Sequence, residues 1–286
     1  MIAMAKTQRW SGGVLSFMGR DPYTTVFAAL VVLIILSAVA APILAPFDPS
    51  TGNAMKRLAP IGTAGHLLGT DELGRDMLSR LLYGGRVSLL LGVLPVFFAL
   101  MIGGTLGVVA GFMGGWVNMV IMRTMDVFYA FPSVLLAIGL SGALGAGPGN
   151  LVIAVTAVLT PQIARVTESV TTQVRSFGFI EAARASGAGS FMIIRYHVLR
   201  NVVGPVLVFA TSLVSVSMII SAGLNFLGFG VQPPTPDWGL MLNTLRQSIW
   251  INPDVAALPG VMIFLTSFCF SQLSDGLRRL LDVKQQ

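Results

Sequence analysis

Residues 87–113 read VSLLLGVLPVFFALMIGGTLGVVAGFM, an apolar run without a single charged side chain. A helix needs about 20 apolar residues to cross the hydrocarbon of a bilayer, because each residue rises only about 1.5 Å. The whole chain of 286 residues is 54% hydrophobic and only 10% charged. This composition excludes an ordinary soluble domain and predicts an all-α integral membrane protein.

Six apolar segments are predicted to cross the membrane as helices. They are residues 24–44, 87–113, 127–144, 151–166, 202–223 and 255–270. The fourth is interrupted by Thr160, Pro161 and Gln162, and the sixth is short. A cleaved signal peptide is the alternative for the first, but that run is long and no convincing A-x-A cleavage site follows Leu44. We therefore expect an uncleaved first helix.

Basic residues indicate the orientation, since cytoplasmic flanks of membrane helices hold an excess of Lys and Arg. With six spans, both termini share a side with the 114–126 turn and the 167–201 loop, and that side carries 12 of the 18 basic residues. The other side has six, accompanied by six acidic residues, and most of them lie in the 45–86 segment. We expect both termini, including a cytoplasmic segment 1–23, on the cytoplasmic side of a bacterial inner membrane.

Residues 181–201 read EAARASGAGSFMIIRYHVLRN and form a polar, small-residue segment between the fourth and fifth apolar runs. The segment resembles the EAA loop of ABC importer permeases, whose pattern is E-A-A, three residues, G, nine residues, then I-x-L-P. The matching residues are Glu181, Ala182, Ala183, Gly187 and Leu199. Two positions depart from the pattern, because His197 stands where the family usually has Ile and Arg200 where it usually has Pro.

The composition of the same segment also predicts a surface that can dock on a partner, independently of the resemblance. Its alanines and glycines predict a short helix with a nearly featureless surface, which could lie deep in a groove of a partner. Glu181 near the start of that helix suits the helix dipole and could pair with a basic residue of the partner. A polar loop that merely contains several alanines is the competing interpretation.

Two further stretches resemble the dipeptide, oligopeptide and nickel branch of these permeases. HLLGTDELGRDMLSRLLYGGRVSLLLG, residues 66–92, resembles the segment that leads into the second helix. Thr70 or Asp71 could cap a short interfacial helix there, with Asp76 and Arg80 one turn apart on it. A contact with a docked binding protein is the functional alternative.

NFLGFGVQPPTPDWGLML, residues 225–242, resembles the segment after the fifth helix in the C-type subunit of this branch. Its prolines must end the helix, and its tryptophan suits an interfacial belt, as does Trp250. A cap over the outer mouth of a pathway and a simple surface turn both fit. The residues of this segment that we single out are Asn225, Gln232, Pro233, Pro234 and Trp238.

These resemblances imply the six-helix architecture of type I ABC importer permeases over residues 24–286, with a cytoplasmic coupling loop at 167–201. They imply a homologous second permease subunit, two cytoplasmic ATP-binding subunits, an extracytoplasmic solute-binding protein and surrounding lipid. The solute would be a peptide, a nickel complex or another small molecule. The chain itself lacks a G-x-x-x-x-G-K-[ST] phosphate loop, so we expect a transport subunit and not an enzyme.

Other classes fit the sequence less well. An ion-coupled secondary transporter would also be apolar, but no ionisable residue falls centrally in a predicted span. The sequence pI of about 10.1 is explained by cationic loops at an anionic membrane, without nucleic-acid binding. No cofactor or metal is predicted, since His66 and His197 lie in loops on opposite predicted faces. Cys269 is the single cysteine and lies in an apolar run.

Gly103, Gly107 and Gly111 follow one another at intervals of four in the second predicted span. This spacing places three glycines on one stripe of a helix and lets another helix approach closely. Helix packing is the expected role of this stripe, and a substrate path along it is the alternative.

Overall fold

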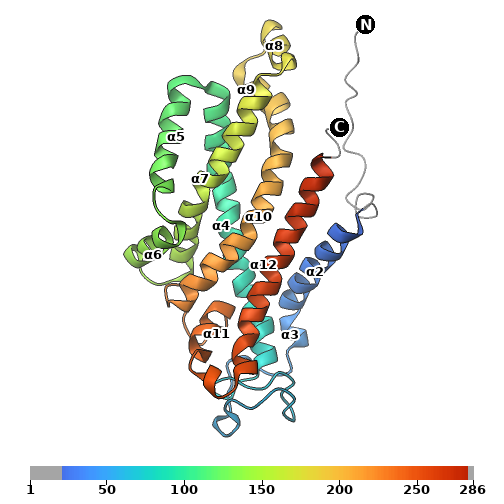
Figure 1. Ribbon diagram of the computed structural model, residues 1–286, viewed down its shortest axis with the longest axis vertical. Helices are drawn as coiled ribbons and strands as arrows, with labels where there is room; N and C mark the ends of the chain where they lie inside the picture. The colour runs from blue at the N-terminus through green and yellow to red at the C-terminus, as the bar shows by residue number, and fades with distance from the viewer. Residues whose placement is uncertain (1–20, 283–286) are drawn as a thin grey trace.

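A computed structural model of the chain describes residues 21–282. Most of its helices run along one long axis (Figure 1). Within these residues five helices are long and apolar enough to cross a membrane, and a bent pair adds a sixth span if it counts as one. The five are α2 Pro22–Val39, α4 Met77–Met113, α7 Pro148–Arg175, the helical run Ser190–Phe226 and α12 Pro253–Asp282. The bent pair is α5 Gly115–Tyr129 and α6 Ser133–Leu144. Five of the six predicted spans are therefore present as long helices in the predicted order, and the third corresponds to the bent pair.

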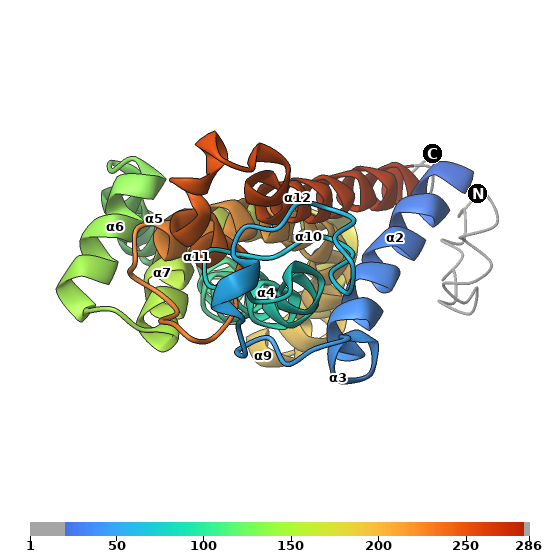
Figure 2. The same ribbon diagram turned by 90° about the horizontal axis from the view of Figure 1, so that it is seen from below.

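Short elements connect the spans at the two ends of the molecule. They are α3 Ala41–Leu44, η1 Ala54–Lys56, α8 Gly178–Ala185, α11 Trp238–Leu245 and η3 Ser248–Trp250. The start of α2, the end of α12, the α4–α5 turn and α8 all lie toward one end, and the 45–76 loop lies at the other (Figure 1). The view along the long axis shows α4 and α10 in the middle, α2 on one flank and α5 with α6 on the other (Figure 2).

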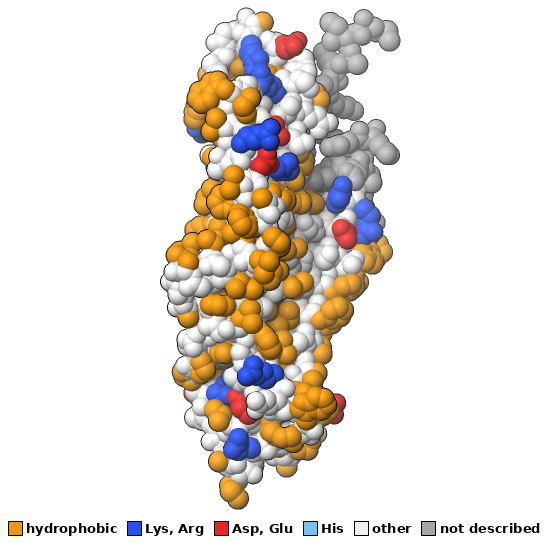
Figure 3. Space-filling model, turned by 60° about the vertical axis from the view of Figure 1, so that its left-hand side comes forward, with side chains coloured by type: hydrophobic (Ala, Val, Ile, Leu, Met, Phe, Trp, Pro, Cys, Tyr) orange, Lys and Arg blue, Asp and Glu red, His pale blue; other side chains and the backbone are white. Residues whose placement is uncertain are grey.

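A broad band of hydrophobic side chains crosses the middle of the α5–α6 flank, with charged side chains above and below it (Figure 3). Large apolar side chains such as Leu33 and Phe264 are exposed on other spanning helices. Such a surface is stable only in hydrocarbon, because in water an apolar area of this extent would drive aggregation.

The second span begins ten residues earlier than predicted, at Met77. Asp76 caps it, because the Ser79 amide and hydroxyl both donate to Asp76 Oδ2 at 2.8 Å. The expected interfacial helix before it is wrong, since residues 57–76 form turns and isolated bridges. Thr70 and Asp71 cap no helix there, and Arg80 pairs with Asp71 rather than with Asp76.

The glycine stripe of α4 packs directly on α7, as expected. A β-carbon at Gly103 would lie 2.5 Å from the Thr160 carbonyl oxygen, and one at Gly107 would lie 2.5 Å from that of Ala164. The α7 helix continues through Pro161 to Arg175, so it is longer than the predicted 151–166. Close backbone contact between α4 and α7 forms the centre of the fold.

The third span is not the straight helix that residues 127–144 predict. Helix α5 ends at Tyr129, α6 starts at Ser133, and the two meet at 88°. Pro132 occupies the position before α6, and a proline disfavours helical conformation in the residue that precedes it. The bend therefore has a local cause in the sequence.

The predicted 167–201 loop is mostly helical. Helix α7 runs to Arg175, and α9 Ser190–Ile193 passes through a π-helical turn, η2 Ile194–Val198, into α10 Leu199–Phe226. Arg200 lies inside this continuous run, which its backbone N–H permits and a proline would strain. Most of the predicted 1–23 segment, with Lys6, Arg9 and Arg20, lies outside the described residues, as does Lys284.

Candidate functional site

Helix α8 stands at the extremity of the molecule, beyond the ends of α7 and α10 (Figure 1). Phe177 precedes it in extended conformation, and Glu181 occupies its first turn. An acidic side chain at this position interacts favourably with the positive end of the helix dipole. The predicted short helix is thus present, and it contains three of the five matching EAA residues.

One side of α8 is fixed to the rest of the protein. The Ile180 side chain is fully buried, and Ala183 packs, half-buried, against the core. The Arg184 guanidinium lies 5.5 Å from the ring centroid of Phe112, in the last turn of α4. This cation–π contact and the buried isoleucine hold α8 in a set position relative to α4.

Gly187 ends the helix for a backbone reason. Its φ is +80°, a conformation that favours glycine. Its N–H donates to the Arg184 carbonyl at 2.9 Å, and the Ala188 N–H donates to the Ala183 carbonyl at 3.1 Å. These bonds close the helix in the manner of a Schellman motif, which satisfies carbonyls that the helix end would leave unpaired. The spacing from Glu181 to Gly187 is therefore that of one helix and its cap.

The other side of α8 is exposed and made of small residues. Ala182, Ala185, Ser186 and Gly187 are exposed, and nothing lies within 4 Å of a β-carbon built on Gly187. Glu181 is also exposed and makes no ion pair with any residue between 21 and 282. The result is a smooth, unobstructed surface with one free carboxylate.

Leu199 does not lie on this surface. It starts α10, after the π-helical turn, and is partly exposed. His197, in that turn, lies with its ring centroid 6.1 Å from the ring of Phe179 at the start of α8. The histidine thus connects the base of α8 with the helical run that follows it.

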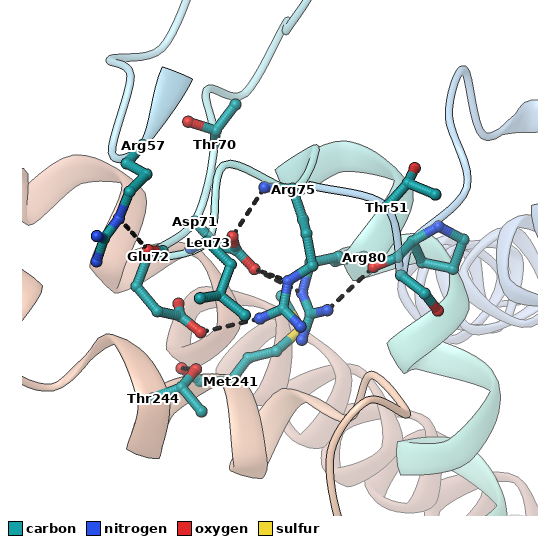
Figure 4. Close-up of polar contacts among 12 residues, drawn as sticks. Thr51, Arg57, Thr70, Asp71, Glu72, Leu73, Arg75, Arg80, Met241 and Thr244 are labelled. Carbon is teal, nitrogen blue, oxygen red and sulfur yellow. Dashed lines mark hydrogen bonds and ion pairs between the residues drawn. The ribbon is translucent and has the colours of Figure 1, made fainter. Parts of the chain in front are cut away.

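The opposite end of the molecule is stiffened by a buried charge cluster (Figure 4). Arg75 Nε donates to Asp71 Oδ2 at 2.6 Å, and Arg80 Nε lies 3.1 Å from the same oxygen without hydrogen-bond geometry. Arg80 also donates to the Pro49 carbonyl at 3.0 Å. Met241 and Thr244 of α11 lie beside the cluster (Figure 4). These contacts tie the 45–76 loop to the start of α4.

The proline-containing segment after α10 is anchored at both ends. Asn225 is buried, and its Oδ1 accepts from the Val231 N–H at 2.8 Å. Gln232, Pro233 and Pro234 are exposed between this anchor and the buried Trp238. The exposed part is a surface turn at the end of the molecule opposite α8, and its relation to a pathway stays a prediction.

Trp238 is not an interfacial residue, which corrects the sequence-based interpretation. It is only 1% exposed, and its Nε1 donates to the Leu81 carbonyl at 2.9 Å. Its ring occupies space beside Gly84 and Gly85, where a β-carbon on Gly85 would lie 2.9 Å from it. The adjacent glycines were the only sequence signal for this contact. Trp250, by contrast, is 91% exposed, as an interfacial residue would be.

Similar proteins agree with this description. The chain is 41% identical over 263 residues to the glutathione transport system permease protein GsiD of Pectobacterium atrosepticum, covering 92% of this chain and 87% of that protein. It is 42% identical over 257 residues to the protein of the same name from Escherichia coli strain 536, covering 90% and 85%.

Solved structures share the fold. The MetNI methionine ABC transporter in an inward-facing conformation matches with a TM-score of 0.56 at 20% identity, covering 70% of this chain and 97% of that one. An amino acid ABC transporter matches with a TM-score of 0.53 at 18% identity, covering 70% and 94%. At these identities the likeness concerns the fold alone.

The identity to permease proteins over nine-tenths of the chain, together with this fold, defines a permease component of an ABC importer. Residues 103–285 match the family described as the binding-protein-dependent transport system inner membrane component, and the chain belongs to this family. It is accordingly a multi-pass inner-membrane protein that works with a second permease and with ATPase subunits. Nothing in the comparisons supports an ion-coupled transporter.

Proposed function

We propose that this chain is one half of an importer for small peptides of about the size of glutathione. The high identity to glutathione permeases over nine-tenths of the chain supports this solute class. The exposed helix α8 supports the second part of the proposal, the docking of ATPase subunits. It is a small-residue helix fixed on one side, and no residue between 21 and 282 covers its other side. In this proposal ATPase subunits dock on Glu181, Ala182 and Gly187, and ATP hydrolysis occurs in those subunits only.

The proposal places α8 and both termini in the cytoplasm. The excess of basic residues on that side supports this orientation. Closed ATPase subunits would then pull on α8, and the contacts of Ile180 and Arg184 would pass the displacement to the spans. A ligand shifts such an equilibrium only by binding one state more tightly than the other.

At the outer end, a solute-binding protein would dock on the 45–76 loop and on the turn of Gln232, Pro233 and Pro234. The buried cluster around Asp71 supports this role, since it gives a rigid platform, and rigid surfaces lose less entropy on binding. Trp250 would lie among lipid headgroups at this end.

A cysteine at position 185 tests docking and orientation together. Ala185 is exposed on α8, and the native Cys269, which is buried, is replaced by serine to remove background. In intact cells Ala185→Cys should react only with thiol reagents that enter the cytoplasm. In membranes, the ATPase subunits should slow its labelling strongly, because a docked subunit would cover the thiol. Labelling by reagents that stay outside the cell would contradict the proposed orientation. Labelling at the same rate with and without the ATPase subunits would exclude docking at α8.

Gly187 provides a second, independent variant. In Gly187→Asn, the asparagine tolerates the positive φ of this position better than most residues do, but it adds a side chain to the open surface. We expect normal membrane levels and weaker co-purification of the ATPase subunits. Gly178→Ala, at the first position of α8 with open space around it, is the matched control and should co-purify normally.

A further inference from the structure

Helix α7 has a polar stripe that the contacts with α4 leave uncovered. Gln162, Arg165, Ser169 and Thr172 follow at intervals of three or four, which places them on one side of the helix. Gln162 is half-buried, and Arg165 and Thr172 are exposed. The glycine stripe of α4 packs on a different face of α7. The polar stripe thus needs either water or a polar partner.

Charged side chains gather where this stripe meets α5. Arg165 forms an ion pair with Asp126, and its guanidinium lies 5.1 Å from the ring centroid of Tyr129. Arg123 lies 3.7 Å from the other Asp126 oxygen. The Arg165, Asp126 and Arg123 side chains are 51%, 41% and 80% exposed. These three side chains carry one net positive charge, and the next acidic side chain is Glu168, one turn further along α7, which accepts from the Thr172 hydroxyl at 3.1 Å.

The positive group adjoins a small cavity at the bend between α5 and α6. The cavity holds about 170 Å³ and is lined by Tyr129, Ser133, Gln162 and neighbouring apolar side chains. Arg165 lies one turn from Pro161, which also lines it. The lining thus contains one amide and two hydroxyl groups, and the Arg165 guanidinium lies outside it but nearby; all are donor types that bind a carboxylate.

The neighbouring part of α7, before Pro161, differs from this polar stripe. There, a larger cavity of about 510 Å³ has an almost entirely apolar lining, which includes Ile153 and Ala157. The hydroxyls of Thr156 and Thr160 in its wall are directed to backbone carbonyls. This part suits hydrocarbon, whereas exposed charges within spanning helices are stable only toward water or a polar partner. Helix α7 is therefore apolar where residues 152–161 line the larger cavity, and polar along the stripe that follows it toward α8.

We infer that the polar stripe of α7 lines the solute pathway and that Arg165 binds a carboxylate of the passing peptide in exchange for Asp126. Arg123 makes the exchange feasible, because Asp126 keeps a cation when Arg165 turns away. The inference rests on the proposed function, since peptides of the glutathione class carry carboxylates. It assigns a solute class to residues that no motif singled out.

Thiol labelling of the assembled transporter in neutral-lipid nanodiscs tests this inference even while the solute is unidentified. Gln162→Cys in a Cys269→Ser background is treated with anionic sulfonatoethyl or cationic trimethylammonioethyl methanethiosulfonate. The anionic reagent should be favoured at position 162. The preference is the ratio of the anionic to the cationic labelling rate. A unit charge at about 6 Å alters each rate roughly threefold in water and in opposite directions, so Arg165→Gln should lower this ratio about tenfold and Asp126→Asn should raise it. Arg165→Lys should retain the preference.

Each alternative gives a distinct result. If Arg165→Gln and Asp126→Asn leave the preference at position 162 unchanged, these charges do not act on a solute there, which overturns the inference. If Ser169→Cys reacts in the isolated subunit but not in the complex, the stripe is a pairing surface and lines no pathway. A pathway position must also change its labelling rate when vanadate traps the ATPases, whereas Ile153→Cys must not. Because none of these readouts measures uptake, failure here leaves the proposed function standing.

Discussion

At the residue scale, Trp238 and Asp237 show how one buried pair fixes an element. Ser88 on α4 donates to Asp237 Oδ2 at 2.6 Å and accepts from the Trp238 N–H at 3.0 Å. Asp237 also caps α11, accepting from the Leu240 N–H at 3.0 Å. A single serine thus joins the cap of α11 to α4.

Asp237 makes stability depend on pH. Burial raises the pKa of its carboxyl above the ordinary value of 3.8, although hydrogen bonds from Ser88 and backbone amides oppose the shift. The folded state therefore binds this proton more tightly than the unfolded chain, and the stabilisation is lost as pH rises through the folded pKa. Asp237→Asn has no such proton to lose. The melting temperature of Asp237→Asn minus that of wild type should therefore become larger as the pH rises from about 4 to about 8.

The measurement is thermal unfolding in detergent at several pH values. Asp254→Asn serves as control, since Asp254 is an exposed carboxylate in the first turn of α12. A constant difference between Asp237→Asn and wild type at all pH values would contradict the assigned role of burial.

At the element scale, the sequence predicted which helices exist better than where they end. Apolar runs of sufficient length indicated all six spans, because hydrocarbon tolerates no unpaired backbone. Helix ends depend on caps and packing instead, so the start of α4 at Met77 and the end of α7 at Arg175 were missed. Short-range spacing was sufficient to predict the helix α8, whereas the role of Gly187 as its cap was not predicted. The Arg165–Asp126 pair was not predicted, because its partners lie 39 positions apart.

The α4–α7 contact provides a matched pair of glycines. A β-carbon at Gly107 would lie 2.5 Å from the Ala164 carbonyl oxygen, whereas one at Gly104 would meet nothing nearer than Leu100 at 3.9 Å. Gly107→Ala should therefore force the helices apart and destabilise the protein by about 1–3 kcal/mol. Gly104→Ala should be neutral or slightly stabilising, since alanine favours helix.

Unfolding in a denaturing detergent series compares the two variants directly. Equal stability of Gly107→Ala and Gly104→Ala would mean that α4 and α7 do not pack as closely as the structure has them.

At the scale of the whole molecule, the chain has two differently built ends joined by an apolar band. One end carries the small exposed helix α8, and the other carries a platform stiffened by buried ion pairs. Between them, α7 is apolar where residues 152–161 line the larger cavity and carries a polar stripe over residues 162–172. This arrangement agrees with the proposed function, in which the subunit receives solute at one end and mechanical work at the other, and a second permease completes the pathway.

Uptake into proteoliposomes tests this account most directly. The chain is reconstituted with its second permease, ATPase subunits and binding protein, and radiolabelled glutathione is the probe. We expect uptake only with ATP and the complete set of subunits, and none from the chain alone under a proton or sodium gradient. Robust gradient-driven uptake by the chain without any ATPase would contradict the account and restore an ion-coupled mechanism.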